Sequence, residues 1–103
     1  KVLPEELKRA EDIVNAKIGE DLPMTFVELP IEEAKKTGAL YYFKEKYPER
    51  VKVYYAGKSL ETAYSREFCG GPHVTHTGEL KKFRIMKEEA VSAGIRRIRA
   101  TVE

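Results

Sequence analysis

A thiol and an imidazole lie four residues apart in the run CGGPHV, residues 69–74. Cys69 and His73 belong to the residue types that bind zinc, which takes about four nitrogen or sulfur ligands in a tetrahedron. The two glycines permit sharp turns and Pro72 disfavours a helix, so we expect a tight loop that brings the thiol and the imidazole together. With His76 as a third ligand, the set would be of a kind that holds catalytic zinc and a water molecule. The run therefore predicts part of a metal site.

The same run also has an interpretation without a metal. Free cysteine is among the most buried residue types, so Cys69 can be a core residue beside a solvent-facing His73. A Cys-x₃-His pair is less specific than a paired Cys-x-x-Cys pattern. His76 is equally open, either as a third ligand or as a surface histidine. The residue types and their spacing leave both interpretations in place.

Length and composition predict one small domain. The chain has 103 residues, of which 42% are hydrophobic, and this is enough for a modest core. Its single cysteine excludes an internal disulfide, as is typical of a reducing cytosolic compartment. No apolar run approaches the ~20 residues that span a bilayer, and no leader opens the chain. We expect a cytoplasmic protein without a membrane partner, and Lys1 at the first position suggests a segment of a longer one.

Basic residues gather in the second half of the chain. Residues 51–103 carry ten Lys and Arg against six Asp and Glu, whereas residues 1–50 carry nine against eleven. The basic residues near the end are Lys81, Lys82, Arg84, Lys87, Arg96, Arg97 and Arg99. Such a density can follow a phosphate backbone if the side chains share a face. A net charge of +2 does not require nucleic acid, so a solvated charged face remains the alternative.

The first half predicts two helices and a strand. Pro4 opens a helix that Gly19 can end, with a stripe of apolar residues at helical spacing. The stripe consists of Leu7, Ala10, Val14 and Ile18. Residues 24–29 predict a strand, and Pro30 opens a short helix that Gly38 ends. We expect the aromatic residues that follow to pack around the core, with base stacking as the alternative; they are Tyr41, Tyr42, Phe43 and Tyr47.

The second half predicts strands. Residues 51–55 alternate apolar and polar side chains, and a turn at 56–59 leads into a second strand at 62–68 that ends at Cys69. After a turn at 77–78, residues 83–86 and 95–102 predict two more strands. On the last strand Arg97 and Arg99 take the face opposite Arg96, which gives a plausible phosphate surface. The fold class is therefore α+β, with a small antiparallel sheet and two or three helices.

Three runs occur in a specific order and spacing: FCGGPHV at 68–74, TGEL at 77–80 and AGIRRI at 93–98. Together they resemble the C-terminal part of the editing domain of alanyl-tRNA synthetase, which also occurs in stand-alone alanyl-tRNA deacylases. Upstream runs resemble the same domain, so the similarity covers nearly the whole chain; they are PEEL, LP, EAKKTGA and FKEKY before VKV. The resemblance implies the fold of the threonyl/alanyl-tRNA synthetase second additional domain. It also implies that residues 1–103 form the C-terminal part of an editing domain within a larger chain.

The resemblance further implies a function. The domain would hydrolyse tRNA for alanine that carries serine or glycine, within an enzyme whose main reaction is ATP-dependent attachment of alanine to tRNA. Cys69 and His73 match two of the four zinc-ligand positions, and the other two come in the family from an upstream His-x₃-His that this sequence lacks. No complete catalytic site is therefore expected in this chain alone. We expect its tRNA to be the alanine-specific one, and its other partners to be the remaining domains of the parent synthetase.

Four more residues are expected to bind the tRNA. The amides of Gly70 and Gly71 would donate hydrogen bonds to the developing oxyanion or to the terminal ribose, because they lie beside Cys69. Arg96 and Arg97 would contact the tRNA backbone, with salt bridges on the sheet as the alternative role.

One position departs from the alanyl pattern. Pro72 stands where the alanyl family usually has Thr, whereas the threonyl editing domain has Cys-x-Gly-Pro-His. The run AGIRRI favours the alanyl family, because threonyl enzymes do not continue in that way. Pro72 removes a hydroxyl and an amide donor beside the site. The alternatives are a non-catalytic tRNA-binding module, a structural or dimerisation domain, and the same segment of a deacylase or a threonyl-tRNA synthetase.

Overall fold

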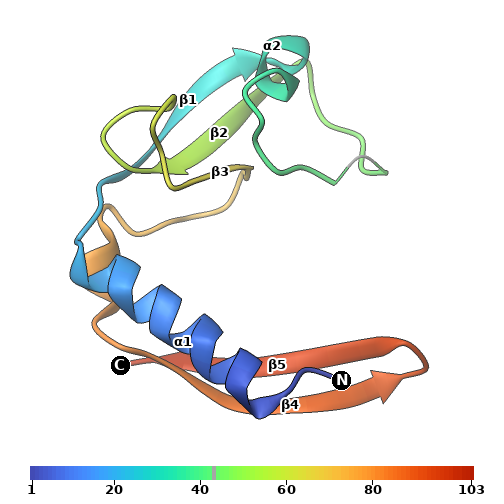
Figure 1. Cartoon of the computed structure of the whole chain (residues 1–103). Helices are drawn as coiled ribbons and strands as arrows, with labels where there is room; N and C mark the ends of the chain where they lie inside the picture. The colour runs from blue at the N-terminus through green and yellow to red at the C-terminus, as the bar shows by residue number, and fades with distance from the viewer. Residues whose placement is uncertain (43) are drawn as a thin grey trace. The chain divides into compact units, whose positions relative to one another are not determined.

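The computed structural model describes residues 1–42 and 44–103, which fall into two compact units. The terminal unit combines Lys1–Asp21 with Thr77–Glu103, and the central unit is Leu22–His76. Both units combine helices with antiparallel strands, so the α+β class is confirmed (Figure 1). The strands are divided between a sheet of three and a sheet of two. Phe43, which was assigned to an aromatic cluster, lies outside the described residues.

The central unit contains the three-stranded sheet. Its strands β1 (Met24–Pro30), β2 (Arg50–Ala56) and β3 (Ser65–Phe68) are antiparallel, with β2 in the middle. The short helix α2 (Ile31–Lys35) follows β1, as Pro30 predicted, and Gly38 beyond it has a φ of 81°.

One face of this sheet forms the core. Val51 and Val53 are buried and Lys52 between them is exposed, which confirms the predicted alternation. Ala34 and Ala39 complete the buried cluster. Partly buried residues pack around it: Val27, Leu29, Ile31, Tyr47, Leu60 and Phe68. Because successive side chains of a strand alternate between faces, the residues between the buried valines lie on the opposite, outer face.

The second predicted strand of this unit is shorter than expected, because it begins at Ser65 rather than at Thr62. The preceding residues form a turn in which the hydroxyls of Ser59 and Thr62 are 2.7 Å apart. Gly57 starts this turn with a φ of 143°, and a Cβ there would lie 3.0 Å from Cα of Ala63. Because the two backbone segments approach each other closely here, residues 62–64 form a turn and the strand begins only at Ser65.

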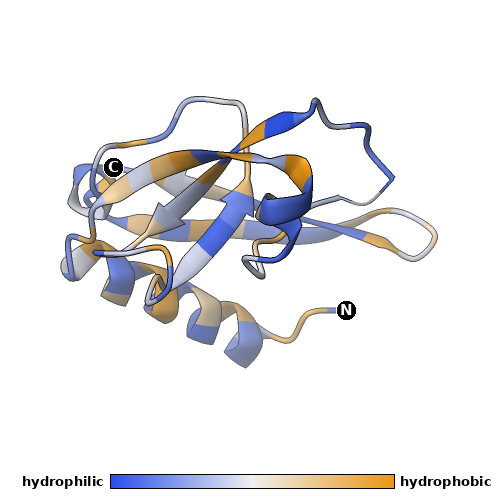
Figure 2. Cartoon of the chain, turned by 90° about the horizontal axis from the view of Figure 1, so that it is seen from above, coloured by the Kyte–Doolittle hydropathy of each residue, from blue (hydrophilic) through white to orange (hydrophobic). Residues whose placement is uncertain are grey.

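The terminal unit contains helix α1 (Pro4–Gly19), the 3₁₀ helix η1 (Thr77–Leu80), and the hairpin of β4 (Phe83–Ser92) and β5 (Ile95–Val102). Hydrophobic and hydrophilic residues interleave along α1 (Figure 2). In the predicted apolar stripe Ile18 is buried, but Ala10 is exposed. The helix begins as expected, and the Leu3 N–H donates to Oε1 of Glu6 at 2.8 Å.

Strand β4 is longer than the sequence predicted, which ended it at Met86. Charged residues follow Met86 and have low strand propensity. They are nevertheless held in the strand because β4 pairs with β5 along its whole length, from Phe83 opposite Val102 to Ser92 opposite Ile95. Register shifts lie between 85 and 87 and between 90 and 92.

Helix α1 binds the free edge of β4 through polar side chains. The Asn15 side chain donates to the carbonyl of Phe83 at 2.9 Å and accepts from its N–H at 2.8 Å. Oε2 of Glu11 accepts the N–H of Ile85 at 2.8 Å. These bonds satisfy edge groups that would otherwise be open to pairing with another strand.

In the described part of the chain, no helix has the length and apolar character needed to cross a membrane.

Candidate metal centre

Three possible metal ligands converge in the central unit. Ligand atoms of Glu67, Cys69 and His73 all lie within 4.8 Å of one another, and each residue is partly buried. Glu67 belongs to β3, Cys69 follows the end of that strand, and His73 follows the Gly-Gly-Pro turn. The structure thus brings the thiol and the imidazole together across the turn.

The backbone holds Cys69 at the edge of the sheet. Its N–H donates to the carbonyl of Lys52 at 3.2 Å, which continues the pairing of β3 with β2 by one residue. The Gly71 N–H points back at Sγ of Cys69 at 3.4 Å. A Cβ on Gly71 would be 3.8 Å from the sulfur, an ordinary contact. The sulfur position is therefore set by the backbone on both sides of Gly70, which is itself exposed.

His73 lies flat against Tyr54, with ring centroids 4.0 Å apart and an angle of 22° between the planes. The following segment runs back along β1, where the Met24 N–H donates to the carbonyl of Thr75 at 2.9 Å. Nε2 of His73 is buried and has no hydrogen-bond partner among the described residues. An unsatisfied buried polar atom costs about 1–3 kcal/mol. A metal ion at this nitrogen would remove that cost.

The donors present fit zinc. Zinc binds sulfur, imidazole nitrogen and carboxylate oxygen, and the cluster offers one of each. His76 is not a member: it is exposed and forms an isolated bridge with Pro23. Sequence reasoning missed Glu67, although a carboxylate two residues before Cys69 at the end of a strand lies on the same face.

A cavity lies beside the cluster. Its volume is about 460 Å³, within the range of small-molecule sites, and Cys69 and Gly70 form part of its wall. Cationic, acidic and aromatic groups all line it; they are Lys52, Arg50, Glu28, Glu45 and Tyr47.

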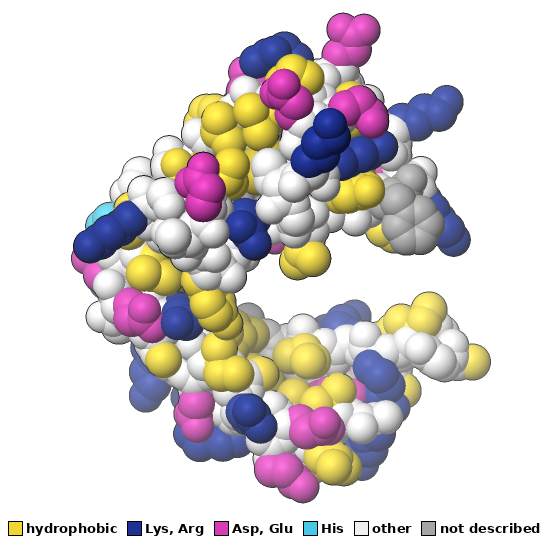
Figure 3. Space-filling view, turned by 45° about the horizontal axis from the view of Figure 1, so that its top comes forward, with side chains coloured by type: hydrophobic (Ala, Val, Ile, Leu, Met, Phe, Trp, Pro, Cys, Tyr) yellow, Lys and Arg dark blue, Asp and Glu magenta, His cyan; other side chains and the backbone are white. Residues whose placement is uncertain are grey.

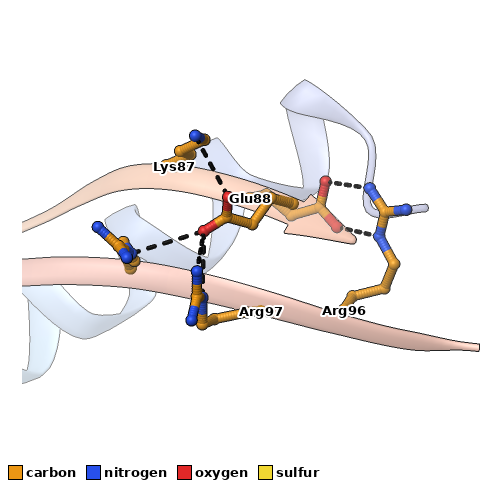
Figure 4. A network of polar contacts seen from close by, with 6 residues as sticks. Lys87, Glu88, Arg96 and Arg97 are labelled. Atoms are coloured by element: carbon orange, nitrogen blue, oxygen red, sulfur yellow. Dashed lines mark hydrogen bonds and ion pairs between the residues drawn. The ribbon is translucent and has the colours of Figure 1, made fainter. Parts of the chain in front are cut away.

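Arg96 and Arg97 belong to the β4–β5 hairpin of the terminal unit. Arg96 holds both carboxylate oxygens of Glu88, with Nε at 2.6 Å and Nη2 at 2.8 Å (Figure 4). Arg97 donates to Glu89 at 2.7 Å on the other face. Arg96 and Arg97 therefore lie on opposite faces of the hairpin, as the sequence predicted, and each arginine has a carboxylate partner.

The two carboxylates differ in their surroundings. The Glu88 side chain is only 4% exposed, and its pKa is lowered by the hydrogen bonds from Arg96, with a smaller contribution from a backbone hydrogen bond of Val2. The pKa of Glu89 is lowered by hydrogen bonds from Arg97 and Lys87.

Glu89 also contacts Arg99 at 3.5 Å, so three cations share one carboxylate on this face. On the face of the molecule that Figure 3 shows, basic and acidic side chains are otherwise interspersed. The surplus of positive charge around Glu89 is therefore a local feature of the hairpin.

Comparison with known proteins agrees with this architecture. Residues 51–99, which contain all of β2 except Arg50, together with β3 and the metal cluster, match the family described as Threonyl and Alanyl tRNA synthetase second additional domain. The match covers 49 of the 103 residues of the chain.

Among curated relatives, it is 51% identical over 98 residues to the Alanine--tRNA ligase of Treponema denticola and 53% identical over 98 residues to that of Thermus thermophilus. The Alanine--tRNA ligase of Methylobacillus flagellatus is 46% identical over 99 residues. The alignments cover 95%, 94% and 96% of this chain but 16%, 11% and 11% of these relatives. The chain thus corresponds to a segment of alanine--tRNA ligases, and the resemblance found in the sequence is confirmed.

Proposed function

We propose that this chain is part of the editing domain of an alanyl-tRNA synthetase and acts in hydrolysing the ester of mischarged seryl- or glycyl-tRNA for alanine. The observation that carries the proposal is the Glu67, Cys69 and His73 cluster, with its unpartnered buried nitrogen, inside a domain of this family. The longer protein would attach alanine to tRNA with ATP in its other domains and would act in the cytoplasm.

Cys69 and His73 would hold zinc, and Glu67 lies within reach of the same ion. When bound, zinc supplies Lewis acidity and lowers the pKa of a bound water towards ~7. The chain's own donors do not fill a tetrahedral protein set, and by resemblance the remaining ligands are an upstream His-x₃-His. The site would therefore be completed by residues that precede this chain in the longer protein.

The glycine amides take separate roles in this proposal. Gly71 N–H is directed at the sulfur of Cys69 and fixes its position. Gly70 is exposed and lines the neighbouring cavity, so its amide is the one we assign to the developing oxyanion or the terminal ribose. Pro72 then keeps the turn rigid without offering an amide of its own.

The hairpin would contact the tRNA backbone. Arg97, Lys87 and Arg99 surround the single carboxylate of Glu89, so a phosphate can bind there without leaving Glu89 unpaired. Arg96 would contact phosphate only by sharing its guanidinium with Glu88. This cationic face also favours a second candidate function, that of a tRNA-binding module without catalysis.

Paired histidine variants separate the two functions. In the longer protein, His73→Gln should abolish both zinc binding and deacylation of seryl-tRNA for alanine. His76→Gln is the matched control, because His76 is exposed and outside the cluster, and it should leave both intact. Unchanged deacylation in His73→Gln would contradict the catalytic proposal and favour the binding module.

A further inference from the structure

The outer face of the central sheet carries a row of two aromatic side chains and one carboxylate. Phe26 on β1 pairs in register with Tyr54 on β2, and Tyr54 pairs with Glu67 on β3. This face is opposite the buried valines, so the aromatic residues on it do not belong to the core. Phe26 is accordingly 42% exposed.

The rings form a continuous path to the metal cluster. The centroids of Phe26 and Tyr54 are 5.2 Å apart, and Tyr54 in turn stacks on His73 at 4.0 Å. The exposed ring is therefore two ring contacts from the imidazole of the cluster. A ligand that binds on Phe26 can reach the metal site with an adjoining group.

Positive charge accompanies the exposed ring. Nζ of Lys52 lies 4.7 Å from the centroid of Phe26. Lys52 makes no ion pair within residues 1–42 and 44–103, and Glu28, opposite it in register, lies 3.9 Å from Arg50. An aromatic ring beside a lysine without an ion pair suits a nucleotide. The base can stack on the ring while the phosphate forms an ion pair with the lysine ammonium.

We propose that Phe26 stacks the terminal nucleobase of the tRNA and that Lys52 binds its phosphate, so that the acylated ribose is delivered to the Glu67, Cys69 and His73 cluster. This inference rests on the proposed function and adds the subsite for the nucleotide itself. The base is held by stacking on one ring, so discrimination among bases is expected to be weak.

The probe is the trinucleotide CCA, the common 3′ end of tRNA, titrated into the ¹³C-labelled chain in the presence of EDTA. We expect the ring signals of Phe26 to shift on binding. Phe26→Leu keeps the apolar bulk but removes the π face, and it should weaken binding about tenfold. Tyr64→Leu, which alters another exposed aromatic residue of this unit, should bind as the wild type does.

Two further measurements test the assignment of base and phosphate. A trinucleotide with an abasic 3′ end should bind wild type and Phe26→Leu equally weakly. Lys52→Gln should reduce the slope of log affinity against log salt by about 0.7, the value for one single-strand phosphate contact. The inference would be overturned if Phe26→Leu bound CCA as tightly as the wild type does. It would also be overturned if the wild type bound CCA and the abasic probe with equal affinity.

The rest of the longer protein offers a different occupant for this face. If another part of the longer protein covers Phe26, CCA cannot reach the ring and the ring signals of Phe26 will not shift in that protein. This result would also overturn the inference. Because the titration excludes metal, it fails or succeeds independently of zinc binding and ester hydrolysis.

Discussion

Replacing His73 by phenylalanine should stabilise the metal-free chain while destroying the metal site. Phenylalanine keeps a ring against Tyr54, so the stacking energy of about 0.5–1.5 kcal/mol is largely retained. It removes the buried, unpartnered Nε2, whose cost is about 1–3 kcal/mol. The net expectation is a gain of about 1–2 kcal/mol, or roughly 4–8 °C in melting temperature for each kcal/mol in a domain of this size.

The assay is thermal unfolding followed by circular dichroism at neutral pH, with EDTA and with excess zinc. In EDTA, His73→Phe should melt above the wild type. Zinc should raise the melting temperature of the wild type by mass action and leave the variant unchanged. His76→Phe serves as control, because an exposed histidine outside the cluster should give neither effect. A variant that melts below the wild type in EDTA would refute the account in which the buried, unpartnered Nε2 of His73 destabilises the metal-free chain.

Three other changes test the remaining parts of the structure. Gly57→Ala should destabilise the chain by about 1–3 kcal/mol in urea unfolding, since φ is 143° and the new Cβ would lie 3.0 Å from Cα of Ala63; an unchanged midpoint would contradict this turn. Glu88 has a pKa below its usual 4.5, so its stabilising effect is full above pH 4.5 and is lost as the pH falls through the folded value. Glu88→Gln, which removes this carboxylate from Arg96, should therefore flatten the loss of stability on acidification, and an unchanged acid profile would argue against the pair. Arg97→Gln should weaken tRNA binding and lower its salt dependence by about one phosphate contact in filter binding, and an unaltered salt slope would exclude this contact.

Local signals in the sequence predicted most elements of the fold. Pro4 and Pro30 mark the starts of both helices, and the alternation around Val51 and Val53 identifies β2 and its buried face. These signals are reliable because each depends on the residue itself and on its neighbours in the chain. The order of helices and strands, and hence the α+β class, follows from them.

Features that depend on distant partners were missed. Strand β4 extends through charged residues because β5 pairs with it, and Glu88 is stabilised there by Arg96. The late start of the strand predicted at 62–68 depends on how closely Gly57 approaches Ala63. Neither contact is visible in local propensity.

The candidate site shows the same division. Cys69 and His73 were predicted from their spacing, and the structure brings them together. Glu67 lies on the same face as Cys69, because alternate residues of a strand share a face, and it is therefore part of the cluster. His76, which was considered as a third ligand, lies outside the cluster. The stacking of His73 on Tyr54 depends on the return of the chain along β1 and could not be predicted from the loop alone.

The most direct test of the central claim is the zinc content and the deacylation of seryl-tRNA for alanine, measured on this chain and on a longer protein that extends upstream through the His-x₃-His. We expect stoichiometric zinc and hydrolysis in the longer protein, and loss of both with Cys69→Ala but not with His76→Gln. Absence of zinc and of hydrolysis in the longer wild-type protein would contradict a split metal-dependent editing site.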